Sequence, residues 1–359
     1  MRLGALRAPA AALLSLALAA AYGTSRRAAP VRAADEPQAP LRLSETGLYA
    51  AGQLGVIDAR NRPFAPQYPL WTDGASKRRW VALPPGATID ASSEHAWEYP
   101  VGTRFWKEFS FGGRKVETRM LWRATRERWI VAAYVWNDEQ TDAVLAPEAG
   151  VAGIAEVAPG RRHSVPGQAD CVACHGSPTR PLGFGALQLS DDRDPNAPHG
   201  EPLAPGMLTL ATLVAEARLS PDRSDLVAVP PRVRASSPRT RAALGYLAAN
   251  CGSCHDGSAA ITANLSPLGY AAVVADGDAV AAALLARATR FQVPGVAEGA
   301  SVAVDPEAPD HSALVARMRS RRPSSQMPPL GTVLRDQQAI ELIVEWIRAD
   351  LAPVRSASR

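Results

Sequence analysis

Two short motifs contain all four cysteines of this 359-residue chain. Both read C-x-x-C-H, first at Cys171, Cys174 and His175 and again at Cys251, Cys254 and His255. In this pattern the two thiols add to the vinyl groups of a porphyrin, and the adjoining histidine supplies the proximal ligand of the iron. The sequence therefore predicts two covalently attached c-type haems, with His175 and His255 as iron ligands.

Two other chemistries also use closely spaced cysteines. One C-x-x-C pair can act as a redox dithiol, and two pairs together can bind zinc. Neither explains why a histidine follows the second cysteine in both motifs. The wide separation of the motifs is also unusual for a zinc ribbon. Haem attachment is therefore the favoured interpretation, with zinc or dithiol chemistry as its alternatives.

Met327 is the predicted sixth ligand of the iron at His255. It begins the sequence MPPLG, which stands between the second motif and the last expected helix. The two prolines keep this loop extended, so that the sulfur can be presented without a helix. A methionine thioether at this position raises the reduction potential of the haem.

The sixth ligand of the iron at His175 is left open by the sequence. Met207 follows the first motif at a suitable interval and is the first candidate. His163, Met120 and His199 are alternatives, and the position can also be occupied by water or stay open. We therefore expect the first haem to differ from the second in its surroundings.

The element pattern predicts an all-α cytochrome c domain over residues 236–353. Ser237 and Pro238 have the residue types of a helix N-cap and first helical position, and the helix that follows leads into Cys251. Further helices are expected over 279–290, 312–319 and 336–351, the last with one apolar face. A helix that leads into C-x-x-C-H and packs against the last helix is the arrangement of small c-type cytochromes.

An antiparallel β-sandwich is expected over residues 46–158. Seven of the eight tryptophans lie here, and turn signals separate four β-rich runs, at 79–83, 103–111, 115–123 and 129–136. The last two runs are the expected antiparallel neighbours. The tryptophans are interpreted as core residues, with stacking on a carbohydrate or cofactor as the alternative.

Residues 159–235 are expected to form a loop-rich first haem-binding module, with one helix over 207–219. Pro230 and Pro231 mark its end. The predicted fold class is therefore a multidomain α+β protein, in which an N-terminal antiparallel β-sandwich is followed by the haem module and by the all-α domain.

The first 33 residues have the pattern of a signal peptide. Arg2 and Arg7 precede an apolar run over 10–21, and Val31 and Ala33 precede the expected cleavage site. Residues 34–45 then form a linker rich in proline and alanine, and 354–359 a short tail. The sequence thus predicts a periplasmic or secreted protein, which agrees with haem attachment outside the bacterial cytoplasm.

Export also changes the charge of the chain. The formal net charge is +4, and loss of the five arginines in residues 1–33 leaves about −1. We therefore expect no nucleic-acid partner. The apolar run is shorter than a membrane span, which leaves peripheral membrane association and the oligomeric state open.

Several longer strings give the chain a family resemblance. They are YPLWTDGASKRR at 68–79, PVGT at 100–103, ETR at 117–119, YVWNDEQTDA at 134–143, VP at 165–166, NCGSCH at 250–255, MPPLG at 327–331 and WI at 346–347. With these strings the chain resembles a family of exported bacterial diheme c-type cytochromes whose physiological role is unassigned. The resemblance implies haem binding and electron transfer, and it supplies no substrate.

Electron transfer is the leading functional hypothesis. Two haems would pass single electrons between exported redox partners, and no catalytic residue is assigned. One alternative is a diheme peroxidase-like enzyme, in which the first haem is open to substrate. The other is a binding module, in which the β domain recruits a partner dehydrogenase and the haems exchange electrons with it.

Overall fold

The computed structural model describes residues 36–175, 181–255, 268–285 and 287–352. The chain divides into Met1–Pro37 and one compact unit, Gln38–Arg359. The predicted signal peptide and the predicted tail lie outside the described residues. The end of the predicted linker does not, because η2 (Leu43–Glu45) is a 3-10 turn and Leu43 is fully buried.

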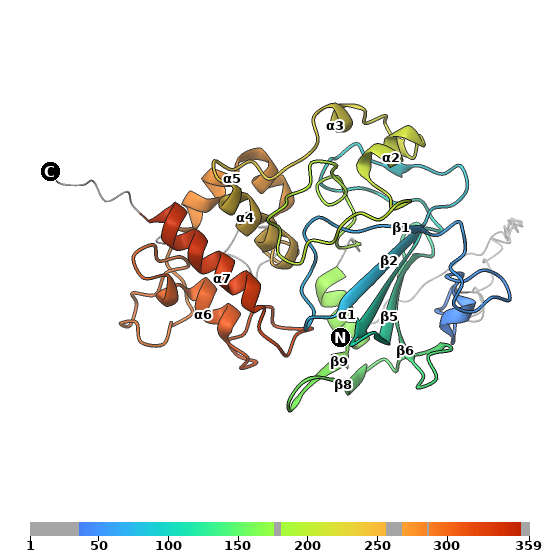
Figure 1. Ribbon diagram of the computed structural model, residues 1–359, viewed down its shortest axis with the longest axis horizontal. Coiled ribbons are helices and arrows are strands. Elements are labelled where there is room, and N and C mark those ends of the chain that lie inside the picture. Colours follow the sequence, from blue (N-terminus) through green and yellow to red (C-terminus); the bar gives the residue numbers. More distant parts are fainter. Residues whose placement is uncertain (1–35, 176–180, 256–267, 286, 353–359) are drawn as a thin grey trace, which may run out of the picture. The chain divides into compact units, whose positions relative to one another are not determined.

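A six-stranded antiparallel sheet forms the N-terminal part of the compact unit (Figure 1). Its four long strands coincide with the four β-rich runs, and the third and fourth pair as expected. The order along the sheet is β1 (Arg62–Pro63), β2 (Ser76–Ala82), β4 (Arg104–Phe111), β5 (Arg114–Arg123), β6 (Trp129–Trp136) and β7 (Ala143–Leu145).

Two smaller pairings lie outside this sheet. β3 (Ile89–Asp90) pairs in parallel with β10 (Leu219–Ser220), and β8 (Val151–Ala158) forms a hairpin with β9 (Arg161–Val165). The first pair contributes Ile89 and Leu219 to the apolar cluster on one face of the large sheet. β9 leads directly into the first C-x-x-C-H motif.

The two faces of the large sheet bury different material. Because side chains alternate along a strand, Trp80, Trp106 and Met120 share one face, where they pack against Leu43 and Leu48. On the opposite face, Val81, Phe105 and Leu121 belong to a second apolar cluster, together with Leu210 and Leu213 of α2 (Leu210–Ala215). The expectation of a β-sandwich is therefore wrong, since the described residues cover both faces mainly with helices and loops, and only the short pair of β3 and β10 adds strands to one face.

The helices of the C-terminal part pack together (Figure 1). They are α4 (Pro238–Asn250), α5 (Tyr270–Leu284), α6 (Ala313–Arg319) and α7 (Gln337–Trp346), the last continued by a π-helical turn over Ile347–Leu351. α4 begins as its sequence predicts, because the Ser237 hydroxyl accepts the Thr240 N–H (2.9 Å). Three further helices precede them among the described residues: α1 (Gln168–His175), α2 and α3 (Asp225–Ala228).

The expected all-α cytochrome c domain is also wrong. The helices do not close a core of their own, because Tyr68 and Leu187 from earlier in the chain are part of their apolar cluster. At Gly245 of α4, a Cβ atom would come within 2.1 Å of the Tyr68 ring. Bridges join Leu285 to Val304 and Ala288 to Val302, so the region also contains extended backbone. The sheet and the helices therefore fold as one unit rather than as consecutive domains.

The helix expected over 207–219 is shorter than the sequence predicts. Leu208 is extended and bridges Phe64, so α2 starts only at Leu210. Ala217 has a left-handed backbone (φ 50°), which ends the helix before β10. Tertiary pairing and a turn thus take residues from both ends of an otherwise helical pattern.

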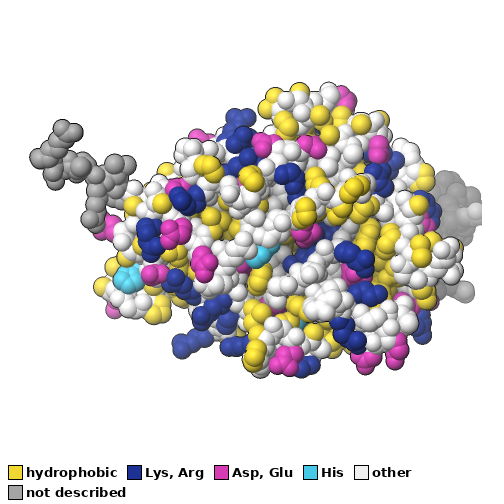
Figure 2. Space-filling model, viewed as in Figure 1, with side chains coloured by type: hydrophobic (Ala, Val, Ile, Leu, Met, Phe, Trp, Pro, Cys, Tyr) yellow, Lys and Arg dark blue, Asp and Glu magenta, His cyan; other side chains and the backbone are white. Residues whose placement is uncertain are grey.

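The molecular surface shows a mixture of charges. Acidic and basic side chains are interspersed on the face drawn in Figure 2. Among the residues that the structure describes, no helix has the length and apolar composition needed to cross a bilayer.

Candidate functional site

The first C-x-x-C-H motif forms the C-terminal part of α1. Residues spaced by three and four positions lie on one face of a helix, so the thiols of Cys171 and Cys174 and the imidazole of His175 share a face. Cys171 and His175 are half-buried, whereas Cys174 is exposed. The Gln168 side chain donates to the Val131 carbonyl of β6 (3.1 Å), which fixes the helix on the sheet.

The second motif forms one helical turn directly after α4. The N–H groups of Cys254 and His255 both donate to the Cys251 carbonyl, at 3.0 and 2.8 Å. The three side chains have the same exposure as their counterparts in the first motif, since Cys251 and His255 are half-buried and Cys254 is exposed. A Cβ atom at Gly252 would lie 2.4 Å from the Ala248 oxygen, so the turn packs too closely for any other residue.

His255 has an unsatisfied ring nitrogen. Its Nδ1 is buried and has no hydrogen-bond partner in the described structure. Burial, followed by the positive charge of Arg317, lowers the pKa of His255 below its usual value. A neutral imidazole is the form that binds a metal, so the protonation state suits an iron ligand.

The two motifs lie near one another. The Cys174 sulfur reaches the surface, yet enough protein surrounds it that burial raises the pKa of the thiol, and the charge of Cys254 is the next cause of the rise. All four cysteines are free thiols, not disulfides. These thiols and histidines fit a covalently attached haem, because each helical turn presents two thiols and one imidazole on one side.

Met327 lies close to the surroundings of His255. Its N–H donates to the Arg317 carbonyl (3.0 Å), and the charge of Arg317 is the one that acts on His255. The Met327 side chain is half-buried. This position is compatible with the predicted role as sixth ligand, which stays a prediction.

The side chains predicted as possible sixth ligands at His175 all have other contacts. Met207 lies in a turn, where its sulfur accepts the Ala204 N–H (3.4 Å). Met120 is fully buried on the face of the sheet that it shares with Trp80 and Trp106. The His199 Nε2 bonds to Asp336 (2.8 Å), and its ring lies against Trp71. His163 is held at both ring nitrogens, so it has none left for iron.

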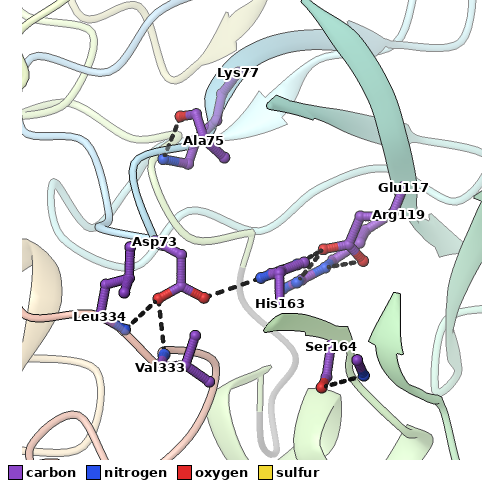
Figure 3. A network of polar contacts seen from close by, with 10 residues as sticks. Asp73, Ala75, Lys77, Glu117, Arg119, His163, Ser164, Val333 and Leu334 are labelled. Carbon is purple, nitrogen blue, oxygen red and sulfur yellow. Dashed lines mark hydrogen bonds and ion pairs between the residues drawn. The ribbon is translucent and has the colours of Figure 1, made fainter. Parts of the chain in front are cut away.

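His163 is the centre of a buried polar network (Figure 3). Its Nδ1 lies 3.0 Å from an Asp73 oxygen, and its Nε2 lies 3.0 Å from a Glu117 oxygen. Arg119 then pairs with Glu117 through two N–H groups, at 3.0 and 2.5 Å. Only the imidazolium can donate from both nitrogens, so this geometry favours protonated His163.

The pKa shifts of the network agree with its geometry. Burial opposes the charge on His163, but hydrogen bonds to Asp73 and Glu117 outweigh it, and the pKa of His163 is raised. Burial likewise opposes the charge on Glu117, but the charge of Arg119 and its hydrogen bonds prevail, and the pKa of Glu117 is lowered. The network is therefore a set of buried charges that stabilise one another.

Residues 68–75 connect this network to both motifs, and we call them the connecting segment. The Trp71 N–H donates to the Asn250 side chain (2.7 Å), immediately before the second motif. The Asp73 carboxylate accepts the N–H groups of Val333 and Leu334, at 2.7 and 2.9 Å, in the loop that follows Met327 (Figure 3). One segment thus contacts the approaches to both motifs and the loop between Met327 and α7.

A row of cations crosses the sheet beside the first motif. Arg79 of β2 is directly opposite Lys107 of β4, which is directly opposite Arg119 of β5. Since they are cross-strand partners, the three side chains share one face. The charges of Lys107 and Arg119 both act on the Cys174 thiol. We call Arg79, Lys107 and Arg119 the cation row.

Sequence reasoning did not find the cation row or the buried network. The three residues of the row lie far apart along the chain, and only the strand register places them side by side. The positions of Lys107 and Arg119 within predicted strands were a usable signal, because charges on the same face as Phe105 and Leu121 are unusual in a core. Nothing local links Asp73 to His163.

Within the described ranges, no group of three or more histidine, cysteine, aspartate or glutamate side chains is arranged to hold a metal ion. Comparison with known proteins adds no assignment: no protein-family model, no curated protein and no solved structure matches this chain. The functional argument therefore depends on the residues and their geometry.

Proposed function

We propose that this protein binds two covalent c-type haems and transfers single electrons between exported redox partners. The observation that carries the proposal is the shared geometry of the motifs, in which two thiols and a histidine lie on one face of one helical turn. When bound, such haems supply one-electron chemistry at iron. The proximity of the motifs supports exchange between the two haems within one chain.

The residues of the chain would attach the haems and set their reduction potentials. The cysteines fix each porphyrin, His175 and His255 bind the two irons, and Met327 raises the potential of the second haem. The half-buried setting of each histidine limits access of water. The different surroundings of the motifs would give the two haems different potentials.

A haem count tests the proposal. The chain is produced in a bacterial host that attaches c-type haem, and the pyridine haemochrome spectrum is measured per chain. We expect two c-type haems in the wild type, one in Cys171→Ala/Cys174→Ala and one in Cys251→Ala/Cys254→Ala. A wild type that carries zinc or free thiols in place of haem contradicts the proposal.

A diheme enzyme is a second candidate, and one observation favours it. Every side chain considered as sixth ligand at His175 has another contact in the structure. An open position there would let a small molecule reach the iron. A high-spin ferric signal at one haem that changes with peroxide supports this candidate, whereas two low-spin haems that ignore peroxide and cyanide support electron transfer alone.

A further inference from the structure

The cation row has too few anionic partners. Arg79 pairs with Glu201 (2.8 Å) and Arg119 pairs with Glu117 (2.5 Å). Lys107 has no carboxylate within ion-pair distance among the described residues, and Lys77 lies on the same face with none. Two lysine side chains on this face therefore have no carboxylate partner among the described residues.

Arg79 shows the same deficit at the level of one atom. Its side chain is only 4 % exposed, and its Nη2 is buried without a hydrogen-bond partner in the described structure. Its Nη1 is already bound to both Glu201 oxygens, at 3.0 and 2.8 Å. A buried guanidinium N–H that lacks an acceptor is costly, so an acceptor belongs at this position.

The row is also unfavourable without an added anion. Like charges directly opposite one another on a sheet destabilise it. Burial, and then the charges of Arg79, Lys77 and Arg119, lowers the pKa of Lys107 well below its usual value. Burial, and then the charges of Arg79 and Arg119, lower the pKa of Lys77 to about 8. The site is thus prepared for negative charge.

The row lies near the first motif, since α1 contacts β6 and β6 pairs with β5, the strand that carries Arg119. Among the groups whose charges act on the Cys174 thiol are Arg119, Lys107 and Asp170 of α1. The Cys171 and Cys174 thiols in turn act on Arg119. The carboxylates near the row are Glu117, Glu201 and, toward Lys77, Asp336. A porphyrin attached at these cysteines carries two carboxylates, which is the charge that the row lacks.

We propose that Arg79, Lys107 and Arg119 bind the propionate carboxylates of the porphyrin attached at Cys171 and Cys174. This inference rests on the proposed function, because it needs the first haem. Guanidinium groups bind carboxylates through paired N–H donors, and Arg79 Nη2 is the donor that is still unused. The row would then keep the propionates ionised and raise the reduction potential of this haem, since nearby positive charge favours the added electron.

The same cations could hold a free oxyanion instead, and the experiment separates the two sources. Potentiometric titrations are carried out on the diheme protein and on Lys107→Met, each with and without inorganic phosphate. We expect the equilibrium constant for reduction of one haem to fall about tenfold in the variant, because the ammonium group that a propionate would keep protonated is lost. In Lys107→Met that potential should also depend on pH near neutrality, because an unpaired propionate has a raised pKa.

Controls distinguish charge from folding. Lys107→Arg keeps the charge and should restore the wild-type potential. Arg78 is next to Arg79 in the chain, but it lies on the opposite face of the sheet and pairs with Glu108 (2.7 Å). The Arg78→Gln variant should therefore shift neither potential. If Lys107→Met loses haem, Arg79→Lys is titrated in its place, because it keeps the charge but loses the planar fork and should give a smaller shift.

Three outcomes overturn the inference. In the first, both potentials are unchanged in Lys107→Met although two haems are attached. In the second, Arg78→Gln shifts a potential as much as Lys107→Met does. In the third, phosphate shifts the wild-type potential but not that of Lys107→Met. The last result assigns the row to a free anion. A chain without haem overturns the proposed function itself, and the haemochrome count separates that failure from the others.

Discussion

The two C-x-x-C-H motifs have the same local geometry but different supports. The first lies on an eight-residue helix against a sheet, and the buried charges of His163, Asp73 and Glu117 precede it. The second follows a thirteen-residue helix whose middle is almost wholly buried among other helices. Each motif thus occupies only one helical turn, and the structure around that turn differs between the two. Under the proposed function, the surroundings of each motif should determine the reduction potential of its haem.

The largest expected effect breaks the support of the first motif. His163→Ala removes the imidazolium and leaves Asp73 and Glu117 as buried carboxylates, which should lower the free energy of unfolding by about 4 kcal/mol. Urea unfolding measures this loss. Hydrogen exchange should show that α1 opens more readily than α4; equal loosening of both would contradict separate supports.

A smaller loss is expected at the support of the second motif. Gly245→Ala places a Cβ atom 2.1 Å from the Tyr68 ring, and such overpacking should cost about 3 kcal/mol. Gly185→Ala is the matched control, because nothing lies within 4 Å of its Cβ position. Hydrogen exchange should now show α4 opening before α1. A Gly245→Ala variant as stable as the control would mean that the Tyr68 contact is not required.

The pH dependence of stability should sharpen the contrast further. His163, with a pKa raised above 6.5, stabilises the fold fully below that pH and loses its contribution as the pH rises through the folded value. Glu117, with a pKa lowered below 4.5, contributes above that pH and loses its contribution as the pH falls through the folded value. The network should therefore stabilise most between 4.5 and 6.5.

Urea unfolding at about pH 5.5 and about pH 8.5 tests this dependence. The difference in unfolding free energy between wild type and His163→Gln should shrink at the higher pH, because glutamine does not titrate. Gly245→Ala should show no such pH dependence relative to wild type. A constant difference for His163→Gln would mean that His163 keeps one protonation state throughout.

The smallest stability effects are expected at two methionines, where spectroscopy is the sensitive measurement. Met327→Ala should remove the sulfur-to-iron charge-transfer band and lower the potential of one haem. Met207→Ala should leave the band intact, because its sulfur contacts its own turn. Each should cost about 1 kcal/mol or less in unfolding free energy. A band that weakens in both variants would mean that both haems are methionine-ligated, and a band that is unchanged in Met327→Ala would refute its assignment.

Local patterns predicted the elements better than their assembly. Alternation and turn residues located β2, β4, β5 and β6, and the Ser237-Pro238 start located α4, because these signals act over a few residues. Which layers cover a sheet depends on distant segments. Leu43 and Leu210 cover opposite faces, and nothing near either residue indicates that, so the sandwich and the separate helical domain were wrong.

The candidate site divides in the same way. The cysteines and histidines of both motifs follow from their spacing, and their haem chemistry stays a prediction. His163 was a reasonable candidate ligand from the sequence, since a histidine shortly before the motif can approach the iron. Its partners Asp73 and Glu117 are 90 and 46 positions away. Such contacts are set by the sheet register and the connecting segment, which no local pattern encodes.

The contact between Tyr68 and Gly245 limits how this chain can be divided for experiments. Pro230 and Pro231 look like a place to cut, and a fragment from residue 236 would contain every helix from α4 to α7. This fragment would lack the Tyr68 ring that packs against Gly245. It would also lack the Trp71 N–H that donates to the Asn250 side chain. The second motif therefore cannot be studied faithfully as an excised piece, and a peptide that supplies residues 68–75 would be needed to complete it.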